Sequence, residues 1–284
     1  MAFNLNYFLK LPNIYFKRTA SMKTNNSNSF MKKYAVQFFR SHRFGGMCLL
    51  SCLVYFSCGF ADAYARTKIT MNTGTAEPFI TADGQGFYGD LIRELFARID
   101  VDAKVVRLPS ARSIINANEG IDDGVVGRTK GMEGKYKNLI MIPVPILRFR
   151  FVAYSLDKKI SIIDWSSLAP YSVGYIRGWY IYEKNLPETK SLTIVNNAEQ
   201  LFKLLMNRRA ELILFEYYRG NWWNQHLNAN AHIIGSPVAE NDMFIYMNKK
   251  HAQLVPNITA ALKAMKKDGT YERIKQETLG KSLQ

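Results

Sequence analysis

Segments typical of strands alternate with segments typical of helices along residues 66–130, and this alternation restricts the possible folds most. Short apolar runs at 68–71, 105–106 and 121–126 predict strands, whereas 91–99 and 110–118 carry apolar residues at helical spacing. The side chains expected to face the core from these two helices are Leu91, Ile92, Leu95, Phe96, Ile114 and Ile115. Strands separated by helices of this length indicate the α/β class, with a mostly parallel sheet covered on both faces.

Two arginines lie at positions where such a sheet would hold a ligand. The apolar run at 121–126 stops at Gly127-Arg128, so Arg128 is expected just past a strand's carboxyl end, beyond which open α/β sheets bind ligands. A guanidinium there can grip a carboxylate with two parallel hydrogen bonds. The alternative is a surface arginine after a turn. Arg112, near the start of its helix, is a second candidate, with a place on the helix surface as its alternative.

The loop after the first expected strand contributes two further candidates, Glu77 and Phe79, which lie past that strand's end on the ligand side. The same loop contains a formal G-x-G-x-x-G at 84–89. A dinucleotide site needs its first glycine in the turn that joins strand to helix directly, whereas roughly ten loop residues intervene here. We therefore expect a turn at Asp83-Gly84 and a helix capped near Asp90 instead.

The second half of the chain presents similar features. Residues 171–176 predict a strand, Gly178 a turn, and Trp179 the start of a helix whose free backbone N–H groups could bind an anion. Trp179 offers a flat face for stacking there, or it packs in the core. Asn197 is expected to cap a helix whose Leu201, Leu204 and Leu205 pack inward.

Glu216 follows the strand expected at 211–215 and so mirrors Arg128 in the other half of the chain. Its alternative is a structural one. An acidic residue is also favourable at the start of a helix, so Glu216 could simply begin the next helix.

Residues 1–65 are expected to lie outside the folded protein. Residues 1–30 are rich in Asn, Ser and Lys without a sustained period, which indicates a disordered extension or a misassigned start. From Met31 a basic flank, an apolar run at 45–60 and small residues at 63–65 form a secretory signal at 31–65, with cleavage expected after Ala65. The alternative is a retained membrane anchor, although a spanning helix needs roughly 18 to 20 apolar residues.

This leader carries much of the basic charge and all three cysteines. The chain has 38 Lys and Arg and 23 Asp and Glu; eight and one of these lie in 1–65, so residues 66–284 carry +8 rather than +15. Basic residues occur there as pairs and form no basic run, which disfavours a nucleic-acid partner. Without cysteine the exported part must rely on its core, and 219 residues can bury one or two.

Motifs for catalysis are lacking in the sequence. There is no G-x-S-x-G, residues 66–284 contain no thiol, and His226, His232 and His251 do not have the spacing of metal ligands. We therefore expect no enzyme, no cofactor and no metal site.

Several segments, taken in order, resemble one protein family. They are the strand before Pro78-Phe79, the helix start at 86–90, the turn at 120–123, the strand and turn at 171–179, the helix at 201–211, the strand at 243–250 and two helices within 258–274. In this order and spacing, residues 66–280 resemble the family 3 extracytoplasmic solute-binding proteins that serve ABC importers.

The resemblance implies a two-lobed type 2 periplasmic binding protein fold, with mixed sheets covered by helices and two crossing hinge strands at about 148–155 and 238–247. Residues 66–151 and 246–284 would form lobe 1, and 152–245 lobe 2. Arg128 would grip a ligand carboxylate, and Glu216 would meet a ligand amine. Arg128 follows its strand more closely than the arginine of amino-acid-binding members does, which leaves the ligand open.

The expected function is therefore periplasmic binding of a small polar solute, an amino acid or a related carboxylate or amine, by closure of the lobes. Expected partners are a small-molecule ligand and a membrane permease, and we expect a monomer. A periplasmic sensory or accessory protein with the same fold, which would report to a sensor protein, is the alternative, and an enzyme is a third option.

Overall fold

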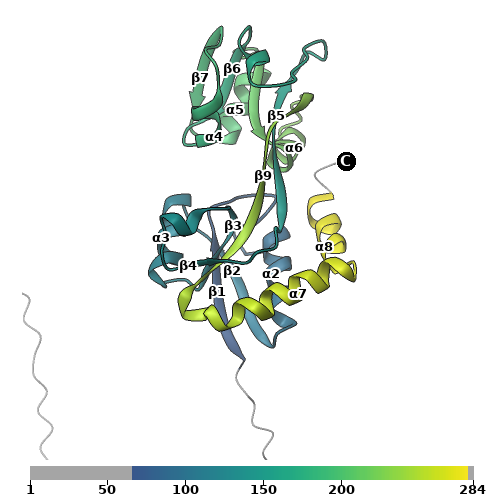
Figure 1. Cartoon of the computed structure of the whole chain (residues 1–284). Helices are drawn as coiled ribbons and strands as arrows, with labels where there is room; N and C mark the ends of the chain where they lie inside the picture. The colour runs from purple at the N-terminus through teal and green to yellow at the C-terminus, as the bar shows by residue number, and fades with distance from the viewer. Residues whose placement is uncertain (1–65, 281–284) are drawn as a thin grey trace, which may run out of the picture. The chain divides into compact units, whose positions relative to one another are not determined.

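The computed structural model describes residues 66–280, which form two lobes around one nine-stranded sheet (Figure 1). The sheet order is β2-β1-β3-β9-β5-β8-β6-β7, and β4 pairs with β9 beside this path. The predictions for the leader and its cleavage after Ala65 concern residues outside the described part of the chain.

Lobe 1 contains the first three strands, which are parallel, and the helices between them. Its elements are β1 (Thr67–Thr73), α2 (Phe87–Ala97), β2 (Val101–Arg107), α3 (Ser110–Glu119), β3 (Gly124–Thr129), η1 (Met132–Gly134), β4 (Leu139–Met141), η3 (Lys249–Leu254), α7 (Val255–Lys267) and α8 (Thr270–Leu279). The last two helices pack against α2, where Arg98 donates to Asp268 at 2.6 Å and to Thr270 at 2.9 Å. The end of the chain thus completes the lobe that its beginning started.

Lobe 2 repeats the same order of strands and helices. Its elements are η2 (Ser166–Leu168), β6 (Ser172–Ile176), α4 (Tyr180–Asn185), β7 (Ser191–Val195), α5 (Ala198–Met206), β8 (Leu212–Glu216) and α6 (Tyr217–His226). The cap predicted for α5 is confirmed, because the side chain of Asn197 accepts from the backbone N–H of Gln200 at 2.8 Å. The strand β7 was not predicted.

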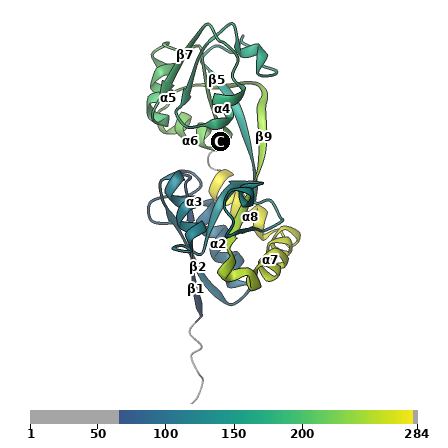
Figure 2. The same cartoon turned by 60° about the vertical axis from the view of Figure 1, so that its left-hand side comes forward.

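Two long strands, β5 (Leu147–Ser155) and β9 (His232–Asn248), run from one lobe into the other (Figures 1 and 2). They pair antiparallel to each other from Leu147 opposite Met243 to Ser155 opposite His232. β9 then pairs with β3 in lobe 1, and β5 pairs with β8 in lobe 2. The two-lobed fold with two connecting strands is therefore confirmed.

Each lobe contains a point where the strand order reverses. β1 lies between β2 and β3 in lobe 1, and β6 lies between β7 and β8 in lobe 2. In each lobe the chain passes from the first strand to the strand at the edge of the sheet, β2 or β7. It then crosses back to form the strand on the other side of the first one, β3 or β8. In open α/β sheets, ligands bind beyond the carboxyl ends of the strands at such a switch point. The fold thus defines two half-sites, one after β1 and β3 and one after β6 and β8.

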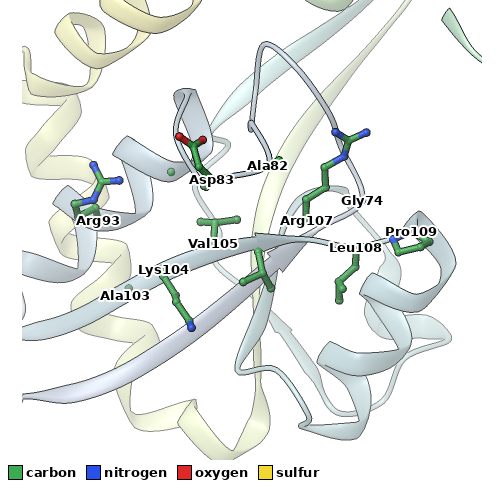
Figure 3. A pocket seen from close by; sticks show the side chains of 13 residues that line it. Gly74, Ala82, Asp83, Arg93, Ala103, Lys104, Val105, Arg107, Leu108 and Pro109 are labelled. Carbon is green, nitrogen blue, oxygen red and sulfur yellow. The ribbon is translucent and has the colours of Figure 1, made fainter.

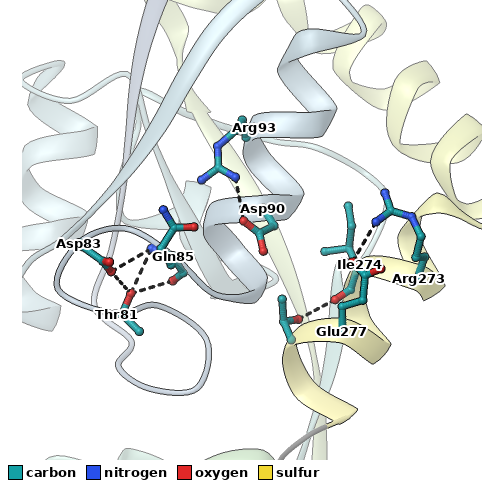
Figure 4. A network of polar contacts seen from close by, with 9 residues as sticks. Thr81, Asp83, Gln85, Asp90, Arg93, Arg273, Ile274 and Glu277 are labelled. Carbon is teal, nitrogen blue, oxygen red and sulfur yellow. Dashed lines mark hydrogen bonds and ion pairs between the residues drawn. The ribbon is translucent and has the colours of Figure 1, made fainter.

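The glycines of the G-x-G-x-x-G segment pack the loop before α2 against the helix. A Cβ on Gly89 would lie 2.1 Å from the carbonyl oxygen of Gly84, so only glycine fits there. The predicted turn is present, with the backbone N–H of Gln85 donating to the hydroxyl of Thr81 at 3.1 Å, and Asp83 also contacts that hydroxyl (Figure 4). The predicted cap at Asp90 is wrong, because α2 begins earlier, at Phe87.

Asp90 instead lies in the first turn of α2. Its carboxylate accepts from Arg93 at 2.8 Å (Figure 4). An acidic residue in this turn is favourable because its charge complements the helix dipole. One other packing prediction is also wrong, since Ile115 on α3 is 51% exposed while Ile114 is buried.

Candidate ligand-binding cleft

A cleft of about 640 Å³ is lined by both lobes and by both connecting strands. Lobe 1 contributes residues from the ends of β1 and β3, and lobe 2 contributes the turn after β6 and the first turn of α6. The lining residues are Gly74, Thr75, Ser110, Arg128, Thr129, Met132, Phe149, Phe151, Arg177, Gly178, Trp179, Tyr180, Ile181, Arg219, Asn241 and Met243. The cleft therefore lies at the two switch points that the strand order defines.

A β-bulge at Gly127 sets the direction of Arg128. The register of β3 against β9 shifts here, so that Val126 pairs with Ile245 and Arg128 with Phe244. Side chains alternate along a strand, and one extra residue moves those that follow to the opposite face. Arg128 therefore lies within β3, not past its end as predicted, and its side chain reaches α3.

Two serines of α3 hold the guanidinium of Arg128. One Nη donates to the hydroxyl of Ser110 at 3.1 Å, and the other donates to the carbonyl of Ser110 and to the hydroxyl of Ser113, both at 2.8 Å. Ser113 in turn donates to the side chain of Asn72 at 2.7 Å, and Asn72 donates to Asp122 at 2.7 Å. This buried chain of hydrogen bonds orients Arg128 without placing a carboxylate on it.

Arg128 lacks a partner of opposite charge among residues 66–280. Its Nε is buried and makes no hydrogen bond, and no acidic side chain lies within ion-pair distance of it. Burial lowers the pKa of Arg128, because the charged form loses hydration. A ligand carboxylate would supply the missing negative charge.

Ser113→Ala is expected to lower the free energy of unfolding by about 1 to 3 kcal/mol, because it leaves the buried amide oxygen of Asn72 without its donor and removes one of the acceptors of Arg128. Urea unfolding of the ligand-free protein measures this. Ser110→Ala is the matched control, since its exposed hydroxyl bonds the same arginine and its loss should cost well under about 1 kcal/mol. Equal losses in the two variants would contradict the buried role of Ser113.

Gly178 and Trp179 both line the cleft. Trp179 also packs into lobe 2, where its ring stacks on Tyr182 at 5.6 Å between centroids and tilts against Phe215 at 5.1 Å. The backbone N–H of Gly178 donates to the carboxylate of Glu183 at 2.9 Å, and that of Trp179 donates to the carbonyl of Ile176. These two N–H groups are thus not free for an anion.

Two arginines of lobe 2, Arg177 and Arg219, line the cleft and were missed by the sequence reasoning. Arg219 lies in the first turn of α6, and its guanidinium carbon is 5.5 Å from the ring of Trp179 and 5.0 Å from that of Phe215. Such cation–π contacts hold a guanidinium against an aromatic surface. Arg177 is exposed at the end of β6. The signal that could have found Arg219 is its place just after the third strand of lobe 2.

Glu216 does not line the cleft. It is fully buried and caps α6, where one carboxylate oxygen accepts from the backbone N–H of Arg219 at 3.0 Å and the other has no hydrogen-bond partner in the described part of the chain. The alternative left open by the sequence, that Glu216 begins the next helix, describes its position.

Burial raises the pKa of Glu216 from its ordinary value of 4.5 to about 7. Between pH 4.5 and about 7 the folded protein therefore binds more protons than the unfolded chain, and the stability contributed by the protonated group is lost as the pH rises through this window. Relative to Glu216→Gln, the wild type should lose about 3 kcal/mol of unfolding free energy across this range. Urea unfolding at a series of pH values measures it, and parallel pH profiles for the two proteins would contradict the shift.

The three remaining candidates lie outside the cleft. Both carboxylate oxygens of Glu77 accept hydrogen bonds from Arg107 at 3.2 Å. Phe79 is fully buried and stacks on Tyr88 and Phe149, because the loop after β1 folds back onto the core. Arg112 is exposed on α3, which is the helix-surface position left open as its alternative.

A second cavity of about 680 Å³ lies within lobe 1, along the edge strand β2 (Figure 3). Its charged lining residues are Asp83, Arg93, Lys104 and Arg107. Arg93 and Arg107 already pair with Asp90 and Glu77. Because lobe 2 contributes nothing to this cavity and its arginines have partners, the cleft between the lobes is the stronger candidate site.

Two lobes with a cleft at their paired switch points define a periplasmic binding protein fold, and the family comparison agrees. The family model of bacterial extracellular solute-binding proteins, family 3, matches residues 69–281. The chain belongs to this family, so the resemblance predicted from the sequence is confirmed. Within residues 66–280 no helix combines the length and the apolar composition that a membrane span requires.

Other proteins share part of the sequence or the fold of this chain. An uncharacterized protein of Shewanella oneidensis is 28% identical over 182 residues, which cover 60% of this chain and 67% of that protein. A histidine kinase sensor domain similar to periplasmic binding proteins has a TM-score of 0.61 at 15% identity and covers 76% of this chain and 96% of its own. The substrate-binding protein of an amino acid ABC transporter has a TM-score of 0.58 at 19% identity and covers 75% and 99%.

Proposed function

We propose that this protein binds a small carboxylate-bearing solute, an amino acid or a related compound, in the cleft between its lobes and delivers it to an ABC importer. The observation that carries the proposal is Arg128, which lies in a cleft lined by both lobes and has no acidic partner among residues 66–280. A carboxylate fits the planar guanidinium with two parallel hydrogen bonds. Residues 31–65 act as the export signal, with cleavage after Ala65, and the mature protein works as a monomer in the periplasm.

Lobe closure follows because each lobe contributes only part of the binding site. Arg128 belongs to lobe 1, and Trp179 with Arg219 belongs to lobe 2. A solute that contacts both half-sites only when they approach binds the closed arrangement more tightly, and this difference in affinity shifts the population toward closure. The strands β5 and β9 are the hinge, and the permease recognises the closed face. The protein binds and releases its solute unchanged.

A thermal-unfolding screen of the purified protein against amino acids, oligoamines and small carboxylates tests this function. A ligand at about 100 times its dissociation constant should add roughly 2.7 kcal/mol to the free energy of unfolding. Only compounds with a carboxylate should do so, and mass spectrometry should recover them unaltered. Stabilisation by oligoamines alone would contradict the proposal, and a chemically altered ligand would point to an enzyme.

The second candidate function is ligand sensing. The similarity to a histidine kinase sensor domain favours it, because that domain shares the fold and nearly its whole length is covered. The two functions use the same cleft and differ in the membrane partner. A neighbouring permease and ATPase gene would favour uptake, whereas a neighbouring sensor kinase or cyclase gene would favour signalling.

A further inference from the structure

The charged side chains that line the cleft are all arginines. Among the described residues, Arg128 comes from lobe 1 and Arg177 and Arg219 come from lobe 2, and the lining contains no aspartate, glutamate, lysine or histidine. A ligand in this cleft therefore meets positive charge from both sides. The ammonium group of an amino acid would find no carboxylate among these lining residues.

Arg219 is the most informative of the three. Its Nε is buried without a hydrogen-bond partner, and its guanidinium forms no hydrogen bond or ion pair with residues 66–280. Its close contacts are the rings of Trp179 and Phe215. Because a poorly hydrated charge is costly unless it is paired, a group placed this way is suited to receive an anion from outside the chain.

The carboxylates near Arg219 do not take this role. Glu216 and Glu77 both act on its charge through space, but Glu216 bonds the backbone N–H of Arg219 and Glu77 is held by Arg107. Neither lies within ion-pair distance of the guanidinium of Arg219. Arg107 also lies near Arg219, but its charge is paired with that of Glu77.

We propose that the solute carries two anionic groups, a carboxylate bound by Arg128 and a second carboxylate or a phosphate bound by Arg219 with Arg177. This inference rests on the proposed function and names the ligand class for that same cleft. The two anionic groups bridge the lobes, so the second arginine site is completed when the lobes close. The rings of Trp179 and Phe215 hold the guanidinium of Arg219 in place before a ligand binds.

Isothermal titration of the purified protein with matched ligand pairs tests the proposal. Glutamate is compared with glutamine, aspartate with asparagine, and succinate with butyrate, and phosphoserine against serine tests the phosphate form. The dianionic member of at least one pair should bind about tenfold tighter or more, the effect expected of a charge-assisted hydrogen bond. Arg219→Met should remove this preference, and Arg112→Met, which changes an exposed arginine outside the cleft, should keep it.

The melting temperature of the ligand-free variants adds a second readout. Arg219→Met should be folded and at least as stable as the wild type, since it removes a buried charge without a partner.

Tight binding of glutamine, asparagine or a cationic amino acid that needs Arg128 but shows no preference for dianions would overturn the inference and leave the proposed function intact. If no carboxylate in any pair binds, both fail.

Discussion

Replacing Arg128 by methionine is expected to abolish ligand-induced stabilisation. The substitution keeps an unbranched apolar stem and removes the only guanidinium that lobe 1 contributes, among the described residues, to the lining of the cleft. Losing one partner of a desolvated, hydrogen-bonded charge pair costs about 2 to 5 kcal/mol of binding free energy, or roughly 30-fold to several thousandfold in the dissociation constant. Thermal unfolding with and without a carboxylate ligand from the screen measures the loss.

Arg112→Met is the matched control for this experiment. Arg112 lies on α3, the helix that also holds Arg128 through Ser110 and Ser113, but its side chain is exposed and does not line the cleft. Ligand stabilisation should be unchanged in this variant. A full ligand shift in the Arg128 variant would remove that residue from the site and with it the main support for the proposed function.

Gly127→Ala is expected to lower the free energy of unfolding by about 2 to 5 kcal/mol and to weaken ligand binding as well. Gly127 has a φ of 78°, where a Cβ costs about 1 to 2 kcal/mol. The Cβ would also lie 2.5 Å from the hydroxyl oxygen of Tyr88, a fully buried side chain packed against Phe79 and Phe87, and such overpacking adds about 1 to 3 kcal/mol. Urea unfolding measures the total.

Gly131→Ala separates the two causes. Gly131 has a φ of 92°, but nothing lies within 4 Å of the Cβ that alanine would add. This variant should show the backbone cost of about 1 to 2 kcal/mol alone. Equal losses of unfolding free energy in the two alanine variants would mean that the Cβ added at Gly127 causes no steric strain against Tyr88. Packing would then not fix the bulge.

The fold was accessible from the sequence because its signals are local and repeated. The alternation of strands and helices follows from periodicity within short windows, and the order of the two halves carried the family resemblance. The unpredicted strand β7 shows where this fails. It is an edge strand of five residues, and although Leu192, Thr193 and Ile194 alternate in polarity, so short a run is a weak signal; Leu192 and Ile194 are both exposed in the structure.

The site was accessible only in part, because residues after a strand end can serve different purposes. Arg128 and Glu216 gave the same signal, a charged residue at the end of a buried strand. Gly127 forms a bulge that brings Arg128 to α3, whereas Glu216 has a free helix start beside it and caps α6. Sequence periodicity does not predict a β-bulge, and it does not predict whether a charged residue after a strand contacts a ligand or caps a helix. Arg219 was missed because it lies one helical turn further along the chain.

The strand β9 has a consequence for how the chain acquires its structure. It lies between β3 and β5 in the sheet, and it comes after every other strand in the sequence. Whenever the polypeptide is delivered amino terminus first, β6, β7 and β8 can assemble while β3, which pairs with β1 on one side, still lacks β9 on the other. The portion synthesised earliest is then the last to mature, and its open strand edge stays vulnerable to proteases and to self-association until residues 243–247 emerge.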